Sequence, residues 1–281
     1  MTRPVIHIMR LLKWGRILAR HGALRGIEAA PETPAGVKRL CRIARLGTIQ
    51  PKIPDYATAF QAIGPAAVKL GQTLATRPDL VGEEAARNLL SLQDALAPVG
   101  FDRIKQEIEA VFETPLESLY SEFDPEPVGS ASIAQVHRAV TTDGRKVAVK
   151  VRRPGIDKQF ARDIDTYEWA AAHLEALGGE ATRLRPREVI ANFRRWTLRE
   201  LDLRREAASA SELADAMVGV PTYQVPAIDW DRTASRVMTL DWIDGIKISH
   251  REQLIAAGHD MEAVSANLVN AFLRQAIAEG F

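Results

Sequence analysis

The stretch at residues 127–151 reads PVGSASIAQVHRAVTTDGRKVAVKV, and its pattern decides the fold of this part of the chain. Small residues at 129–132 separate two runs that favour β-strands, and Asp143-Gly144 is a strong signal for a hairpin turn. The run after the turn, residues 146–151, is apolar except at its start and at Lys150. We therefore predict a three-stranded antiparallel unit with a small-residue loop at one end and a lysine on its last strand.

These two features together are what a phosphate-binding site requires. A loop of small residues lets backbone N–H groups approach an anion closely, and a lysine on a strand supplies a fixed positive charge. Taken alone, Val-Ala-Val-Lys at 147–150 is also common in strands that are simply buried. Its position behind a small-residue loop favours the phosphate site.

Length and composition bound the class of protein. The chain has 281 residues, of which 46% are hydrophobic and 26% charged, which suits one large or two modest globular domains. The net charge of +1 hides an asymmetry, because residues 1–52 carry eleven Lys and Arg but only two acidic residues, Glu28 and Glu32. A basic end of this kind suits an anionic surface, either lipid headgroups or nucleic acid, and a solvated basic helix is the alternative.

Cys41 is the only cysteine, so the chain has no internal disulfide and a reducing compartment is expected. No apolar run reaches the roughly 18 residues of a membrane span. Arg10, Lys13 and Arg16 interrupt the apolar positions near the N-terminus, which predicts a basic amphipathic helix on a membrane surface rather than a signal peptide. No histidine lies at metal-ligand spacing from cysteine or carboxylates, so no metal site is predicted.

Apolar periodicity and turn signals predict helices on both sides of the strands. They are expected at residues 5–25, 55–63, 65–75, 83–96, 101–113, 156–177, 186–217, 250–257 and 260–279. Two further strands are expected at 225–230 and 235–242, around a turn at Asp231-Arg232. Asp102 and Asp260 are candidate N-caps, Gly280 is a candidate C-cap, and residues 30–36 are expected to form a linker.

The last predicted helix is apolar around most of its circumference, which is typical of helices buried on all sides. Only two residues follow it, so we expect part of what should cover it to be missing. The chain alone should then expose an apolar patch around Leu268, Phe272 and Ile277.

The order of these parts resembles the smaller lobe of the protein-kinase fold, in which a lysine on a Val-Ala-x-Lys strand holds the α- and β-phosphates of ATP. The glycine-rich loop of ordinary kinases is replaced here by Gly-Ser-Ala-Ser-Ile-Ala at 129–134, which keeps one glycine and should be stiffer. Ser-Ala-Ser-Ile-Ala-Gln-Val-His at 130–137, Lys-Leu-Gly-Gln at 69–72 and Glu-Leu-Asp at 200–202 resemble motifs of the UbiB family of atypical kinase-like proteins. Residues 237–248 resemble the family's lobe connector, and the likeness runs from about residue 56 to 281.

The resemblance implies roles for individual residues. It implies that the nucleotide loop consists of Val128, Gly129, Ser130, Ala131, Ser132, Ile133, Ala134, Gln135 and Val136. Lys150 would pair with the phosphates of ATP, and the lysine of the Lys-Leu-Gly-Gln motif (Lys69, followed by Gly71 and Gln72) would reach into the nucleotide site. There it would restrain the phosphorylation of protein substrates and favour ATP turnover or a reaction on a small molecule.

The lysine on the strand also needs a carboxylate partner, because an uncompensated buried charge costs several kcal/mol. Glu206 is our choice, and Glu200 is the alternative, since both lie on the predicted helix at 186–217. Six residues advance a helix by about 600°, so the two cannot share one face, whereas Asp202 and Glu206 can.

The family pattern continues beyond residue 281 with a His-x-Asp catalytic loop, a downstream Asn and an Asp-Phe-Gly-type metal ligand. We therefore expect a truncated and catalytically incomplete member, with no catalytic residue of its own and with Mg²⁺ expected only for the complete form. The expected fold is α+β, a protein-kinase-like smaller lobe with an N-terminal helical extension and only the start of the larger, helical lobe. Its parts would be a basic helical segment (1–52), the helical extension (53–124), the kinase-like lobe (125–242) and the connector with the first helices of the larger lobe (243–281).

By resemblance, the function is that of an ATP-binding atypical kinase or ATPase supporting ubiquinone biosynthesis. The expected partners are ATP, ubiquinone-pathway proteins or lipid intermediates, and a membrane surface, with no nucleic acid. The expected location is peripheral, on the cytoplasmic side of the inner membrane, or cytoplasmic. A non-catalytic nucleotide-binding or scaffolding module is the alternative from another class. An ordinary small-molecule phosphotransferase is disfavoured, because Lys-Leu-Gly-Gln at 69–72 would have no role there.

Overall fold

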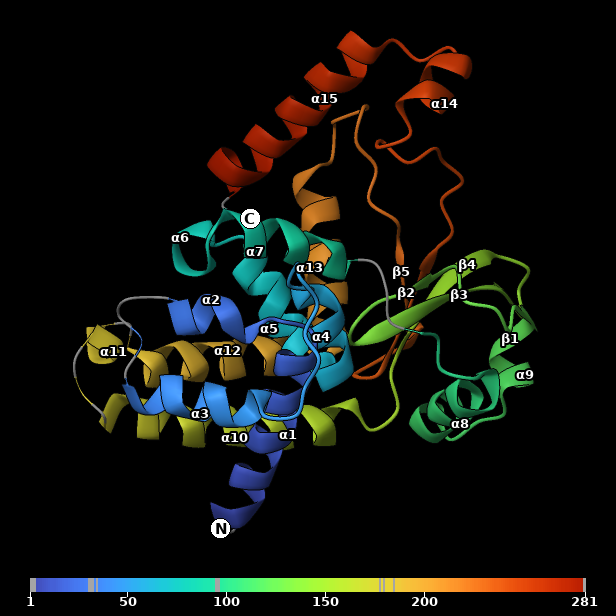
Figure 1. Cartoon of the computed structure of the whole chain (residues 1–281). Coiled ribbons are helices and arrows are strands. Elements are labelled where there is room, and N and C mark those ends of the chain that lie inside the picture. The colour runs from blue at the N-terminus through green and yellow to red at the C-terminus, as the bar shows by residue number, and fades with distance from the viewer. Residues whose placement is uncertain are drawn as a thin grey trace. The chain divides into compact units, whose positions relative to one another are not determined.

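The computed structural model describes residues 4–29, 33, 35–93, 97–176, 178, 180–183 and 185–279 (Figure 1). They form two compact units that are interleaved along the chain. We call residues 1–99, 130–134 and 153–201 the helical unit, and residues 100–129, 135–152 and 202–281 the sheet unit. Of the linker expected at 30–36, residues 30–32 and 34 lie outside the described part, and so does the C-cap expected at Gly280.

The helical unit consists of short helices joined by glycine and proline turns. Its helices are α1 (Pro4–Arg20), α2 (Leu24–Ala29), α3 (Ala35–Arg45), α4 (Tyr56–Ile63), α5 (Pro65–Ala75), α6 (Pro78–Val81), α7 (Glu83–Leu89), the 3₁₀ helix η1 (Leu90–Gln93), α10 (Ile156–Ala176), α11 (Glu180–Arg183) and α12 (Pro186–Glu200). Asp55 caps α4 by accepting a hydrogen bond from the Thr58 amide at 3.0 Å. The helix expected at 5–25 is shorter, ending at Arg20, and the one expected at 83–96 changes to 3₁₀ geometry at Leu90.

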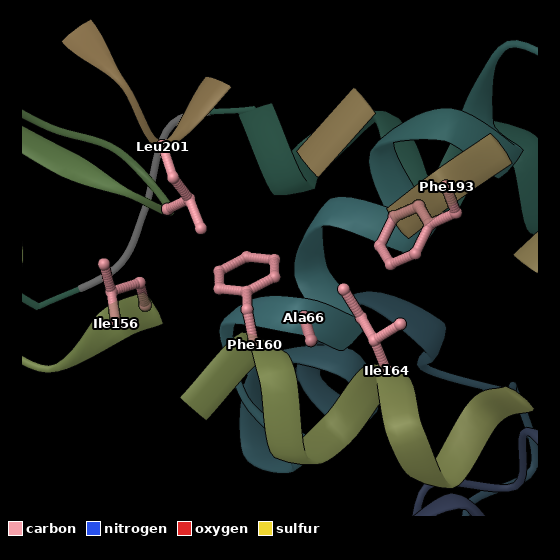
Figure 2. Packing of buried hydrophobic residues seen from close by; sticks show 6 residues of the cluster. All are labelled: Ala66, Ile156, Phe160, Ile164, Phe193 and Leu201. Atoms are coloured by element: carbon pink, nitrogen blue, oxygen red, sulfur yellow. The ribbon is translucent and has the colours of Figure 1, made fainter. Parts of the chain in front are cut away.

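The core of the helical unit lies between α5, α10 and α12. Its buried side chains are Ala66, Ile156, Phe160, Ile164, Phe193 and Leu201, with Leu70 and Ile190 packed against them. Figure 2 shows Phe160 and Ile164 on successive turns of α10, with Ala66 of α5 beside them. The i, i+4 spacing of Phe160 and Ile164 places both on one face of α10, and this face joins the three helices.

The sheet unit is built around one antiparallel sheet. Its strands are β1 (Tyr120–Phe123), β2 (Gly129–Ser130), β3 (Ala134–Thr141), β4 (Lys146–Arg152), β5 (Ile228–Ala234) and β6 (Val237–Asp241), in the order β1-β3-β4-β6-β5, with β2 paired to β3. Its helices are α8 (Phe101–Phe112), α9 (Leu116–Leu119), α13 (Leu203–Ala216), α14 (Arg251–Ala256), α15 (Met261–Leu273) and the π-helical turn η2 (Arg274–Glu279). The hairpin expected at Asp143-Gly144 joins β3 to β4, and Gly144 takes the positive φ of +87° that this turn requires.

Several sequence predictions for this unit are wrong in detail. Strand β1 was not expected at all. The turn between the last two strands lies at Ser235-Arg236 instead of Asp231-Arg232, because β5 continues to Ala234. Helix α8 has Gly100 at its N-cap position, so the expected cap at Asp102 is wrong. Asp260 does cap α15, accepting a hydrogen bond from the Glu262 amide at 2.9 Å.

The long helix expected at 186–217 is also wrong, because the chain forms α12 and α13 with a break between them. The two leucines flanking the break explain it. Leu201 is buried in the core of the helical unit, whereas Leu203 is buried with Ala207 and Met238 in the sheet unit. Asp202 lies between them in extended conformation and caps α13. Consequently Asp202 and Glu206 do not share a helix face in the way the sequence suggested.

The C-terminal helix α15 exposes much of its apolar surface. Leu268, Phe272 and Ile277 are each more than half exposed, and Ala271 is the buried residue of the helix. Among the described residues, no helix is both long enough and apolar enough to pass through a bilayer.

Candidate functional site

A lysine and a glutamate meet at the centre of the sheet unit. The Lys150 ammonium on β4 donates to both carboxylate oxygens of Glu206 on α13, at 2.6 and 2.8 Å. The Lys150 side chain is 22% exposed and that of Glu206 is 49% exposed, so a ligand can reach the pair from solvent. Between the two carboxylates that the sequence left open, Glu206 is therefore the one that contacts Lys150.

The sheet explains why the two side chains meet. Lys150 is paired in register with Met238 on the neighbouring strand β6, so their side chains lie on the same face of the sheet. Met238 packs against Leu203 and Ala207, which places α13 over this face. Glu206 lies between Leu203 and Ala207 on α13, so its carboxylate reaches Lys150 on the sheet.

The small-residue loop is a tight turn between β2 and β3. The amide of Val128 donates to the Val136 carbonyl at 2.8 Å, and the amide of Ala131 donates to the Ala134 carbonyl, also at 2.8 Å. Val128, Gly129 and Ala131 are exposed, Ser130, Ile133 and Val136 are intermediate, and Ser132, Ala134 and Gln135 are buried. Gly129 has no positive φ, and a Cβ there would meet nothing within 4 Å, so its backbone stays open to a ligand.

Arg153 holds this loop in place from the start of the following segment. Its guanidinium donates to the Ser130 hydroxyl at 2.7 Å, to the Ala131 carbonyl at 2.9 Å and to the Ala97 carbonyl at 3.0 Å. Its own backbone amide donates to the Ile133 carbonyl at 2.9 Å. Because Ser130 and Ala131 are held by a fixed charged group, the loop is stiffer than a free turn of small residues. Sequence reasoning missed this residue, since nothing in Arg-Arg-Pro-Gly at 152–155 marks which arginine folds back.

We expect Arg153→Ala to loosen the loop. Losing these charge-assisted hydrogen bonds should speed hydrogen exchange of the Ala131 amide by at least about 10-fold. The Val128 amide is the internal control, because it donates to the Val136 carbonyl and takes no part in the contacts of Arg153 given above. Hydrogen exchange followed by NMR would measure both amides, and unchanged protection of Ala131 would refute the clamp.

The Lys-Leu-Gly-Gln motif lies on α5, in the helical unit. Lys69 forms an ion pair with Glu200 at the end of α12, with Nζ 2.5 Å from Oε2. The core brings them together, because Ala66 and Leu70 of α5 pack in the same cluster as Leu201. Glu200 is therefore the partner of Lys69 and not of Lys150.

Gly71 and Gln72 fix the other side of α5. A Cβ on Gly71 would lie 2.5 Å from Cδ1 of Leu92 and 2.8 Å from a ring carbon of Phe60, so any larger residue would force these packed side chains to move. Gln72 Nε2 donates to the Leu92 carbonyl at 3.0 Å, which ties α5 to η1. These two residues of the motif therefore hold the packing that positions Lys69.

Asp202 is the last residue of the Glu-Leu-Asp motif, and it caps α13, the helix that follows the break after α12. Its carboxylate accepts hydrogen bonds from the Arg204 amide at 3.2 Å and from the Arg204 guanidinium at 2.9 and 2.7 Å. The hydrogen bond from Arg204 holds the pKa of the Asp202 carboxyl below its usual value. This capping role keeps α13, and with it Glu206, in position.

His137 is a buried residue of β3 rather than part of a catalytic pair. Its ring nitrogens lie 2.8 Å from Nε2 of Gln135 and 2.8 Å from the Asp124 carbonyl oxygen. Burial lowers the pKa of His137. In the unfolded chain the pKa returns to about 6.5, so the unfolded state binds a proton first as the pH falls.

The free energy of unfolding should therefore fall as the pH drops below about 6.5 toward the lowered pKa of the folded state. Replacing His137 with asparagine should flatten this part of the profile. Urea unfolding at pH 7.5 and 5.5 measures the difference for both proteins. The same fall in both would show that His137 does not titrate as described.

The structure pairs four of the expected site residues, two in each unit. Lys150 and Glu206 meet in the sheet unit, and Lys69 and Glu200 meet in the helical unit. Residues 130–134 of the loop belong to the helical unit, so their convergence with Lys150 on one phosphate stays a prediction. Within the residues that the structure describes, no three His, Cys, Asp or Glu side chains gather so that they could hold a metal ion, and we derive no step through Mg²⁺.

Comparison with known proteins identifies the class. Residues 91–281 match the ABC1 atypical kinase-like domain, and the helices and antiparallel sheet of the structure fit the α+β, kinase-like fold of that class. A probable protein kinase UbiB from Marinobacter nauticus is 39% identical over 223 residues, which are 79% of this chain and 41% of that protein. Another from Cellvibrio japonicus is 34% identical over 280 residues, 99% of this chain and 50% of that protein.

A solved structure from Mycobacterium tuberculosis, of a complex with erythromycin, is 31% identical and covers 66% of this chain and 46% of that chain, with a TM-score of 0.48. The chain thus spans half or less of the length of the curated relatives it matches. It belongs to the UbiB family of atypical kinase-like proteins.

Proposed function

We propose that this chain binds ATP and that Lys150 is its phosphate-binding residue. The observation that carries the proposal is the two-oxygen contact between Lys150 and Glu206. In a kinase-like site such a carboxylate holds the lysine in position to pair with the α- and β-phosphates. A part-exposed lysine that is fixed at one end by a carboxylate keeps a proton free for an incoming phosphate oxygen, since an ammonium has three donors.

The loop from Val128 to Val136 is proposed to cover the phosphates. Its exposed Gly129 and Ala131 present backbone rather than bulky side chains, and the clamp of Arg153 removes much of the entropy that a flexible loop would lose on binding. The Ser130 hydroxyl accepts from Arg153 and can still donate its own proton to a phosphate oxygen.

Lys69 is proposed to control which acceptor reaches the nucleotide. Its ion pair with Glu200 holds the ammonium at a fixed position on α5 instead of leaving it mobile in solvent. The likeness to family motifs implies that a lysine so placed restrains the phosphorylation of proteins and favours ATP turnover or work on a small molecule. Mg²⁺ is proposed only for the complete family form.

We further propose that the chain supports ubiquinone biosynthesis, as an ATPase or atypical kinase in the complete family form. Its partners would be pathway proteins or lipid intermediates, at the cytoplasmic face of the inner membrane. Family membership supports this assignment, and the basic segment before Asp55 supports peripheral association with an anionic membrane.

Nucleotide titration tests the proposal. ATP should raise the melting temperature of the chain in a concentration-dependent way, and AMP, which lacks the β- and γ-phosphates, should do so much less. Measuring ADP release in the same samples separates an enzyme from a nucleotide-binding module. No stabilisation at millimolar ATP would reject the proposal.

A further inference from the structure

The segment from α3 to the start of α4 exposes a continuous series of large apolar side chains. They are Leu40 (61% exposed), Ile43 (46%), Leu46 (69%), Ile49 (96%) and Ile53 (75%). All belong to the helical unit, in which α3 packs beside α1 (Figure 1). Leaving these apolar side chains exposed to water is unfavourable, so we expect a binding partner that covers them.

The packing of α3 explains which of its apolar side chains stay exposed. Cys41 and Ala44 are buried with Ala19 and Leu24, and so form the packed face. Leu40 and Ile43 lie beside this packed face, at the i, i+3 spacing that keeps both on one side of a helix, and Arg39 and Arg42 lie opposite it. The apolar side of α3 is therefore wider than the part that packs within the helical unit, and Leu40 and Ile43 form its exposed edge.

Positive charge surrounds this face. Between residues 33 and 54 the sequence has five cations, Lys38, Arg39, Arg42, Arg45 and Lys52, and no Asp or Glu. Arg39 and Arg42 are exposed beside Leu40 and Ile43. A shallow, open hollow at the end of α3 is lined by Arg25, Glu28, Arg42 and Arg45, where Glu28 pairs with Arg45.

We propose that this face, the α3 surface (residues 39–53), binds an anionic phospholipid bilayer. The apolar side chains would enter the boundary between headgroups and acyl chains, while Arg39, Arg42 and Lys52 pair with phosphates. A second copy of the chain fits less well, because it would bring the same cations face to face. The inference deepens the membrane part of the proposed function and requires no nucleotide binding.

Helix α1, where the sequence placed membrane contact, is packed on one side and exposed on the other. His7, Trp14 and Ala19 are buried, and the Arg10 guanidinium donates to the Arg162 carbonyl at 2.7 Å. The other side exposes large apolar side chains as well, namely Val5, Ile6, Ile8, Met9 and Leu12. Helix α1 is therefore a second candidate for membrane contact, and variants confined to α3 test the α3 surface by itself.

Vesicle co-sedimentation of the full chain tests the proposal. The chain should bind vesicles of 30% phosphatidylglycerol in phosphatidylcholine, bind pure phosphatidylcholine far more weakly, and lose affinity as NaCl rises. The double variant Arg39→Glu/Arg42→Glu should lower the partition coefficient by at least about 100-fold. Leu40→Ser/Ile43→Ser should lower it by about 10- to 100-fold.

Matched changes on α12 are the controls, because this helix exposes similar residues in the same unit. Val189 and Leu198 are 51% and 53% exposed, so Val189→Ser/Leu198→Ser removes comparable apolar surface. Arg195→Glu/Arg199→Glu makes the same change of net charge. Equal losses in the α12 variants, equal binding to neutral vesicles, or no binding by the unaltered chain would each overturn the proposal. So would a dimer in analytical ultracentrifugation that Leu40→Ser/Ile43→Ser dissociates.

A labelled chain gives a measurement that does not depend on destabilising changes. Ile49 lies in a loop and is almost fully exposed, so Ile49→Cys should fold normally and accept a polarity-sensitive fluorophore. The natural Cys41 should react slowly, because it is buried and burial raises the pKa of its thiol. The probe should shift to the blue on phosphatidylglycerol vesicles, whereas the same probe at Val189→Cys should not. No shift at position 49 would contradict the inference.

The nucleotide proposal can fail without affecting this result. A chain that binds anionic vesicles but not ATP would support the α3 surface and reject the site at Lys150, and the reverse outcome would do the opposite.

Discussion

Replacing Lys150 with alanine is expected to weaken ATP binding by at least about 100-fold without unfolding the chain. The lysine would contribute charge-assisted hydrogen bonds to the phosphates, and about 2.7 kcal/mol of such interactions corresponds to this factor. The variant also leaves the Glu206 carboxylate, which now faces Lys150 at 2.6 and 2.8 Å, free to repel the nucleotide. Isothermal titration calorimetry measures the loss.

The structure offers matched controls for this experiment. Lys146 lies on the same strand as Lys150 but is exposed, so Lys146→Ala removes one positive charge from β4 without touching the ion pair. It should change the dissociation constant less than about 3-fold. Glu206→Gln keeps the size of the side chain and should weaken binding by about 10-fold, because Lys150 is then held less firmly. Equal effects of Lys150→Ala and Lys146→Ala would mean that β4 contributes only general charge.

Replacing Gly71 is expected to destabilise the helical unit more than any other change in the family motifs. A Cβ at this position would lie 2.5 Å from Leu92 and 2.8 Å from Phe60, and Leu92 is buried in a packed cluster with little room to move. Gly71→Ala should therefore lower the free energy of unfolding by about 1–2 kcal/mol, and Gly71→Val by about 3 kcal/mol or more. Chemical denaturation with urea measures both values.

Gly36 provides the control for the intrinsic effect of removing a helical glycine. It lies in α3, and a Cβ there would meet nothing within 4 Å. Gly36→Ala should be neutral or should stabilise the chain by up to about 1 kcal/mol, because alanine favours helix. If Gly71→Ala were as harmless as Gly36→Ala, the motif glycine would not be explained by close packing.

The parts of the fold that follow from local rules could be predicted from the sequence. Asp143-Gly144 has the turn chemistry of a tight hairpin, and Asp260 has the side chain that satisfies a helix N-terminus. Both predictions depend on neighbours in the chain, so no knowledge of tertiary packing was needed. The α+β, kinase-like fold followed from the same signals and the family motifs, whereas the order of the strands in the sheet was not predicted.

The parts that depend on tertiary packing could not be predicted. Leu201, Asp202 and Leu203 fit a helical pattern, and the break appears only because the two leucines belong to different cores. Strand β1 has four residues, too few for a periodic signal. The choice between Glu200 and Glu206 depended on the break, since it separates them into α12 and α13, where they contact Lys69 and Lys150.

The central claim is that Lys150 and the loop at 128–136 act on the same triphosphate. An acyl-phosphate derivative of ATP tests it, because such a probe transfers its acyl group to a lysine amine that lies beside the bound phosphates and leaves a stable amide. Mass spectrometry of the labelled chain should find the acyl group on Lys150, with labelling suppressed by excess ATP and by Arg153→Ala, which frees the loop. Labelling of Lys146 in preference to Lys150, or labelling that excess ATP does not suppress, would contradict the account.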